Sequence, residues 1–132
     1  MLEENKIVDQ AQQVMGNLSQ KGHMVTTSQI RKFLTAVNTV TEKVNAYKLE
    51  KTDDYDTLPV ELQAQIKYLK VKLAYQIGRN RSKWGNPVED FEKEARLMSL
   101  LDGIKSSTKE YEKFAHYIEA LVAFHKFYGG KD

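Results

Sequence analysis

The sequence predicts an all-α protein, a single compact bundle of about five helices. Apolar residues recur at spacings of three and four along most of the chain, as on helices that bury one face. Capping residues stand where these runs begin. The 132 residues include only 7 glycines and 2 prolines, and the connections between runs are short enough for antiparallel packing. We therefore expect residues 1–132 to form one domain, although the pattern leaves open a loose attachment of the N-terminal helix.

The first two helices are predicted over about residues 2–18 and from the threonines at 26 and 27 to about residue 49. Apolar residues at helical spacing mark the buried face of the first: Ile7, Ala11, Val14 and Leu18. In the second, Thr26 and Gln29 have the spacing of a capping box. Its apolar face follows at the same period: Ile30, Leu34, Val37, Val40 and Val44. A strand does not fit this run, because a period of two would divide these residues between opposite faces.

The third helix is predicted over about residues 59–81, in the centre of the bundle, after a polar, acidic loop at residues 52–57. Pro59 suits the first turn of a helix, because that position needs no backbone N–H. The apolar ridge repeats every three or four residues: Leu62, Ile66, Leu69, Leu73 and Ile77.

Two further helices complete the bundle. Asn86 followed by Pro87 is a start signal, and the apolar residues after it predict a fourth helix that stops near Gly103: Val88, Phe91, Ala95, Met98 and Leu101. Ser107 and Glu110 have the spacing of a second capping box. The last helix should end at residues 129–130, where glycine can adopt the left-handed cap conformation.

Positive charge is concentrated in the third helix and the segment that follows it. The chain carries a net charge of +2, but between Glu61 and Trp84 there are six cations and no acid: Lys67, Lys70, Lys72, Arg79, Arg81 and Lys83. On a helical wheel they form two edges, with Lys67, Lys70 and Arg81 on one and Lys72, Arg79 and Lys83 on the other. Between the edges, opposite the main ridge, lies a second apolar side: Ala64, Tyr68, Val71 and Tyr75.

Cations interleaved with aromatic rings are typical of surfaces that hold single-stranded nucleic acid, here RNA, with cations on phosphates and rings on bases. The alternative is a helix buried on both apolar sides, whose lysines only reach out to solvent. For the tyrosines, core packing is the better interpretation. For the cations we favour RNA, because a merely solvated helix face usually mixes charges of both signs.

A second basic cluster, Arg31 and Lys32, lies in the first turn of the second helix, where cations oppose the helix dipole. Amide groups at a helix start, with the hydroxyls of Thr27 and Ser28, could hold a phosphate. Ordinary capping beside two solvated charges explains the pattern equally well.

Catalysis by this chain is not expected. The sequence has no cysteine, 3 histidines, and neither a phosphate-binding glycine loop nor a zinc-binding spacing. His116 and Glu119 could share a helix face, but a metal centre in a bundle needs further ligands from facing helices. His125 falls on the apolar face of the last helix, where a hydrogen-bonded core histidine is the usual case. We therefore predict no enzyme, metal or cofactor.

No stretch is apolar enough for a signal peptide or a membrane span, so a cytoplasmic location is expected, with no membrane partner. The absence of cysteine fits a reducing compartment.

Three segments resemble the small subunit of type III-A CRISPR (Csm) effector complexes. They are residues 26–31 (TTSQIR), residues 68–72 (YLKVK) with 74–79 (AYQIGR), and residues 119–128 (EALVAFHKFY) followed by GGKD. Their order and separation match as well, over about residue 26 to the end. The loops at 52–57 and 82–87 and the first helix lie outside the resemblance.

The resemblance implies a non-catalytic helical bundle in an antiviral ribonucleoprotein. Copies of it would stack along the guide RNA and target RNA, beside the large subunit and a filament of backbone subunits that carry the RNA-cleaving aspartate. Matching positions place five residues near RNA: Ser28, Arg31, Lys70, Tyr75 and Arg79. Lys72 and Arg81 join them on charge and Lys32 on adjacency, whereas Trp84 has no counterpart. The rival hypothesis is a purely architectural bundle whose basic face contacts an acidic protein partner.

Overall fold

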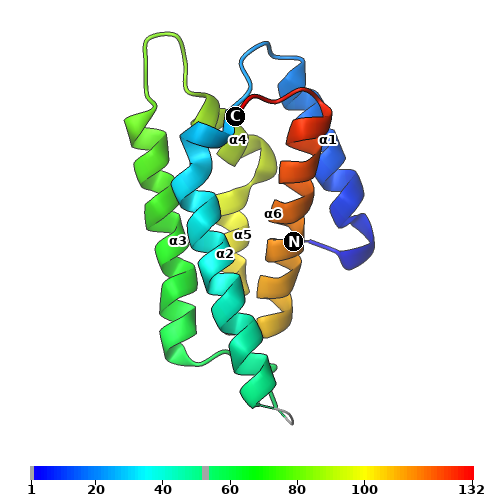
Figure 1. The fold of residues 1–132 in the computed structure, drawn as a ribbon, viewed down its shortest axis with the longest axis vertical. Helices are drawn as coiled ribbons and strands as arrows, with labels where there is room; N and C mark the ends of the chain where they lie inside the picture. Colours follow the sequence, from blue (N-terminus) through cyan, green and yellow to red (C-terminus); the bar gives the residue numbers. More distant parts are fainter. Residues whose placement is uncertain (1, 52–53) are drawn as a thin grey trace.

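A computed structural model describes residues 2–51 and 54–132, which form an all-α bundle (Figure 1). Within these residues a short 3-10 helix, Glu4–Lys6, precedes six α-helices: α1 (Ile7–Ser19), α2 (Thr27–Glu50), α3 (Val60–Arg79), α4 (Pro87–Ala95), α5 (Leu97–Ile104) and α6 (Thr108–Phe127). The all-α prediction is confirmed, and the expected number of about five helices is one too low. Thr52 and Asp53, predicted to lie in a polar loop, fall outside the described residues.

The long helices run side by side, with α2 antiparallel to α3 and α1 along α6 (Figure 1). The short helices α4 and α5 lie behind them and pack against α1, α3 and α6. One cluster of buried apolar residues draws on all six helices, so every helix contributes to the same core. Because α3 and α1 stand at opposite edges, the sequence-based expectation of a central α3 is wrong.

The N-terminal helix is an integral part of this bundle. Ala11, Met15 and Leu18 are almost completely buried, and their partners lie mainly on α6. The α-helical part begins at Ile7, after the 3-10 turn, rather than near residue 2.

The capping box predicted for α2 is complete, whereas the one predicted for α6 is formed only in part. Thr26 and Gln29 form the complete reciprocal capping box of α2. At α6 the Ser107 hydroxyl accepts from the backbone amide of Glu110, which is one half of such a box. Pro59 takes the cap position of α3, immediately before its first residue.

The fourth predicted helix is two helices, because Arg96 breaks it with left-handed backbone angles (φ 58°, ψ 42°). Such angles are disfavoured for a residue with a side chain. Two hydrogen bonds support the break: the Tyr117 hydroxyl donates to the Ala95 carbonyl at 3.1 Å, and the Met98 amide donates to Glu92 Oε2 at 3.2 Å. The apolar period shifts at this point without a glycine or proline to signal it, so residue spacing alone predicted one helix.

Candidate nucleic-acid interface

A shallow groove of about 490 Å³ runs between α2 and α3 on the outside of the bundle. Its walls combine small or apolar residues with one tyrosine and one lysine: Ala36, Thr39, Val40, Ala64, Gln65, Tyr68, Leu69 and Lys72. Lys43 of α2 donates to Gln65 Oε1 of α3 at 2.9 Å, in an exposed contact between the two helices. The groove is therefore a feature of the α2–α3 pair. The sequence analysis assigned function to α3 and to the first turn of α2, but not to Ala36, Thr39 and Val40 further along α2. The helical spacing of Ala36, Thr39 and Lys43 beside the buried positions was the available signal.

The second apolar side of α3 faces solvent. Tyr68, Val71 and Tyr75 have 56%, 50% and 60% of their surface exposed. The core position favoured for the tyrosines is thus wrong, because α3 is an edge helix whose main ridge alone packs inward. Exposed apolar side chains in a continuous row are a mark of a contact surface rather than of a solvated face.

Cations follow the edge of α3 that borders this groove. Lys72 lines the groove, and its Nζ lies 5.7 Å from the Tyr68 ring centroid. Ala36 of α2 and Lys72 of α3 both line the groove, and the two helices are antiparallel (Figure 1). Lys32 lies one turn before Ala36 on the same face of α2, toward the start of that helix. Lys32, Lys72 and Arg79 are exposed and make no ion pair with any residue that the structure describes.

The other basic edge of α3 faces α5 and is partly neutralised. Lys70 Nζ lies 2.6 Å from Asp102 Oδ1, in a half-exposed pair at the surface. Arg81 lies beyond the end of α3, in the connection to α4. The two basic edges found on the helical wheel thus differ in structure: one borders the groove with unpaired charge, and the other carries an acid beside Lys70.

The first turn of α2, predicted as a phosphate site, is occupied by the chain's own C-terminal segment. The amide of Thr27 donates to the Lys131 carbonyl at 3.1 Å, and the amide of Ser28 donates to the Asp132 carbonyl at 2.8 Å. The Ser28 hydroxyl donates to the same carbonyl. A phosphate would have to displace residues 131–132 to reach these donors.

Charged side chains beside this contact also interact with the C-terminal segment. Lys126 donates to the Asp132 carboxylate and holds the pKa of that carboxyl below its ordinary value, with smaller contributions from His125 and Arg31. Of the two predicted cations in this turn, Arg31 is therefore near enough to the Asp132 carboxyl to contribute to the lowering of its pKa.

The histidines have structural surroundings. His125 is buried and its Nε2 donates to the Val25 carbonyl at 2.7 Å, as expected for a core histidine. His116 and Glu119 line a separate cavity between α2 and α6. Among residues 2–51 and 54–132, no three histidine, aspartate or glutamate side chains gather as a metal site would require.

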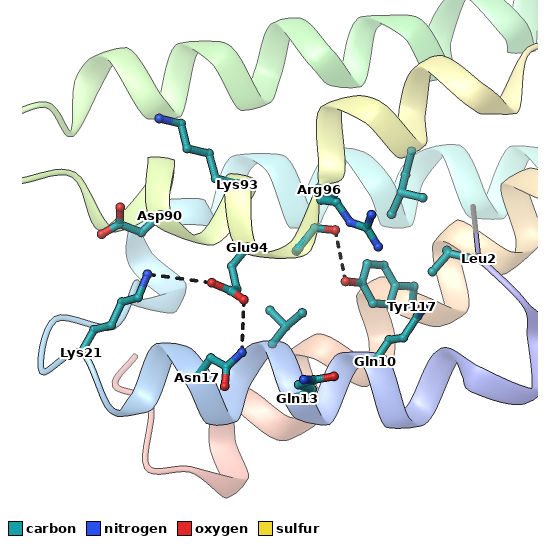
Figure 2. Close-up of a pocket in the computed structure, with 13 residues that line it drawn as sticks. Leu2, Gln10, Gln13, Asn17, Lys21, Asp90, Lys93, Glu94, Arg96 and Tyr117 are labelled. Carbon is teal, nitrogen blue, oxygen red and sulfur yellow. Dashed lines mark hydrogen bonds and ion pairs between the residues drawn. The ribbon is translucent and has the colours of Figure 1, made fainter.

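A second cavity, of about 530 Å³, opens between α1 and the α4–α5 junction (Figure 2). Its polar side chains bond to one another: Glu94 accepts from Asn17 at 3.2 Å and lies 3.8 Å from Lys21. The Tyr117 hydroxyl in the same wall is bonded to the Ala95 carbonyl. Tyr117, the aromatic residue in the lining of this cavity, is buried, whereas the α2–α3 face presents exposed tyrosines beside unpaired cations.

These observations define a class of protein: a small all-helical protein with an exposed basic and aromatic face. The family model described as Csm2 Type III-A matches residues 2–131. A protein named CRISPR system Cms protein Csm2 from Streptococcus thermophilus is 33% identical over 135 residues, which cover 100% of this chain and 98% of that protein. Proteins of the same name from Mycobacterium tuberculosis H37Rv and Enterococcus italicus are 31% and 32% identical and cover 95% and 93% of this chain, and 93% and 84% of their own lengths. The chain belongs to the Csm2 family of type III-A CRISPR systems, as the resemblance predicted.

None of the helices in the described part of the chain has the length and apolar character needed to cross a membrane.

Proposed function

We propose that this protein is a non-catalytic small subunit of a type III-A CRISPR complex that holds the guide and target RNA along its α2–α3 face. The observation that carries the proposal is the row of exposed tyrosines beside cations without acidic partners: Lys72 and Arg79 on α3, and Lys32 on α2. Membership of the Csm2 family, whose relatives are named as CRISPR system proteins, supports this proposal.

The cations would neutralise phosphates without reading sequence, which suits a complex whose specificity comes from base pairing. Tyr68 and Tyr75 offer flat, exposed rings on which a base or a ribose can lie, and stacking on such rings contributes about 1–3 kcal/mol per base. Lys70 and Arg81 would add charge from the neighbouring edge. Ser28 and Arg31 would join only when the C-terminal segment leaves the first turn of α2.

Salt-dependent RNA binding tests the proposal directly. In a reconstituted complex, Lys72→Ala combined with Arg79→Ala should weaken RNA binding at every sequence and lower the slope of log affinity against log salt by about 1.5–2 units. Lys93→Ala combined with Lys109→Ala removes the same charge from α4 and α6, where both lysines are exposed, and serves as the control. Equal effects of the two pairs would reject the α2–α3 face as the RNA surface.

A second candidate is a purely architectural subunit. The walls of the α2–α3 groove are mostly apolar, and Tyr68, Val71 and Tyr75 extend that apolar surface outward, as a protein contact would require. Neighbouring copies, backbone subunits or the large subunit would then cover it, and the cations would meet an acidic partner. Lys72→Glu combined with Arg79→Glu separates the two: assembly should fail in the architectural case, and should survive with weakened RNA binding in the first.

A further inference from the structure

The connection between α3 and α4 contains a tight, internally bonded turn. The Ser82 hydroxyl donates to the Gly85 carbonyl at 2.9 Å and accepts from the Trp84 amide at 3.2 Å, and the Gly85 amide donates to the Ser82 carbonyl at 3.2 Å. Gly85 has a φ of 118°, which a residue with a side chain rarely adopts. These bonds fix the backbone around Trp84.

Both ends of the connection are anchored in the bundle. The Asn80 side chain donates to the Gln76 carbonyl at 2.7 Å, in the last turn of α3. Asn86 is buried, and its amide donates to the Ile77 carbonyl at 2.8 Å while its oxygen caps α4. The turn is therefore held at a defined place at one end of the molecule (Figure 1).

This anchored turn presents the largest apolar side chain of the chain to solvent. Trp84 has 80% of its surface exposed, although burying an indole ring is normally among the stronger stabilising contributions in a protein. Nothing in the fold requires the ring at this position, because the residues that hold the turn are its neighbours Ser82, Gly85 and Asn86.

The surroundings of Trp84 are cationic. Lys83 Nζ lies 5.1 Å from the centroid of the indole ring, which leaves the opposite face of the ring open. Arg79, Arg81 and Lys83 are exposed and form no ion pair with the described residues, and the sequence has no acid between Glu61 and Glu89. A protein-binding tryptophan is normally framed by other apolar residues, whereas this one is framed by charge that complements phosphate.

We propose that Trp84 is a stacking platform for an unpaired base of bound RNA, with Arg79, Arg81 and Lys83 holding the phosphates on either side of that base. The inference rests on the proposed function, because Arg79 ends α3 and the turn follows it at the end of the bundle where α2 begins (Figure 1). It adds a specific preference: a base can cover the indole only where the RNA is single-stranded or a nucleotide is displaced from a duplex.

The test uses the fluorescence of Trp84, because the chain contains 1 tryptophan. The full chain is titrated with a short oligouridylate, a short oligoadenylate and an RNA duplex of equal length, while anisotropy of end-labelled RNA reports binding independently. We expect saturable quenching by the single strands and much weaker quenching by the duplex. Trp84→Ala should weaken single-strand binding by roughly 5-fold to 100-fold without changing the salt slope.

Two variants make the result specific. Trp84→Phe keeps an aromatic ring and should recover part of the lost affinity. Phe127→Ala removes another largely exposed aromatic ring, at the end of α6, and should have no effect. Binding without quenching, with full affinity in Trp84→Ala, would overturn the stacking inference and leave the proposed function intact. If the wild-type chain binds none of the probes, the stacking inference falls, and the salt series on the reconstituted complex decides the proposed function separately. Loss of complex assembly in Trp84→Ala with normal RNA binding would assign the turn to a protein contact and reject the inference.

Discussion

The hydroxyl of Tyr117 donates to the backbone carbonyl of Ala95 at 3.1 Å, at the residue where α4 ends. The bond joins α6 to the junction between α4 and α5, where Arg96 has left-handed backbone angles. We predict that Tyr117→Phe lowers the free energy of unfolding by about 1–3 kcal/mol, because a buried carbonyl loses its partner while the ring volume is kept. Urea unfolding measures the change, and an unchanged midpoint would show that the junction does not depend on this bond.

Stability should fall at alkaline pH, because two tyrosines are buried in their neutral form. Burial raises the pKa of Tyr111 to about 12, against a smaller lowering by its hydrogen bond with Thr41. Burial likewise raises the pKa of Tyr117 to about 12. An unfolded tyrosine ionises near 10, so the unfolded chain holds fewer of these protons above that pH, and the stabilisation present below pH 10 is lost as pH rises toward 12.

Each of these tyrosines should contribute a loss of about 1.4 kcal/mol per pH unit in that window. Urea unfolding at stepped pH, together with phenolate absorbance, measures the effect. Tyr111→Phe combined with Tyr117→Phe serves as the control, since its stability should depend less on pH over the same range. An equal pH dependence in the double variant would assign the alkaline loss to other groups.

Gly78 weakens α3 without a packing reason. A Cβ added there meets no atom within 4 Å, and the residue lies on the exposed row with Tyr68, Val71 and Tyr75. We predict that Gly78→Ala raises the free energy of unfolding by about 0.5 kcal/mol, because alanine restricts the unfolded chain and favours the helix. Gly22→Ala is the matched control: it also has open space, but its φ of 79° makes alanine destabilising. A lower melting temperature for Gly78→Ala would contradict the prediction.

The sequence predicted those parts of the fold that depend on local signals. The Thr26–Gln29 capping box and the inward ridge of α3 follow from residues a few positions apart, and both are present. The break at Arg96 was missed, because it depends on Tyr117, which is distant in sequence. The exposure of Tyr68 and Tyr75 was missed for a related reason. A helical wheel shows that α3 has two apolar sides, but it does not show which of them packs against another helix.

The candidate site was likewise predicted only in part. Charge density and spacing identified the basic edges of α3, yet spacing could not tell that Asp102 pairs with Lys70. Nor could the start of α2 reveal that residues 131–132 occupy its amides, because this contact joins segments about a hundred residues apart. Trp84 stood out only as an unexplained residue until its exposure and the bonds of its turn were known.

The C-terminal segment depends on a small residue beside a buried ring. A Cβ at Gly130 would lie 2.4 Å from atoms of the His125 imidazole, which is fixed by its bond to Val25. Gly130→Ala should therefore displace the segment and lower the free energy of unfolding by about 1–3 kcal/mol. Gly103→Ala, where a Cβ meets nothing within 4 Å, is the control. Thermal unfolding compares the two, and equal melting temperatures would show that the segment adapts without loss.

Asp102 should weaken RNA binding by Lys70, because its carboxylate pairs with the lysine ammonium group. The pair is exposed, so Asp102→Asn should change the free energy of unfolding by less than about 1 kcal/mol. If Lys70 contacts RNA as proposed, releasing it should raise RNA affinity several-fold and steepen the salt slope by about 0.7–0.9 units, as one added phosphate contact does.

Glu112→Gln is the matched control for this experiment, because it breaks the Lys48–Glu112 pair and adds the same charge between α2 and α6. Titration of labelled RNA with both variants across a salt series separates a local effect from one of net charge. An equal gain in both would mean that RNA responds to total charge alone. A gain confined to Asp102→Asn would place Lys70 at the RNA, since only that variant frees a cation on α3.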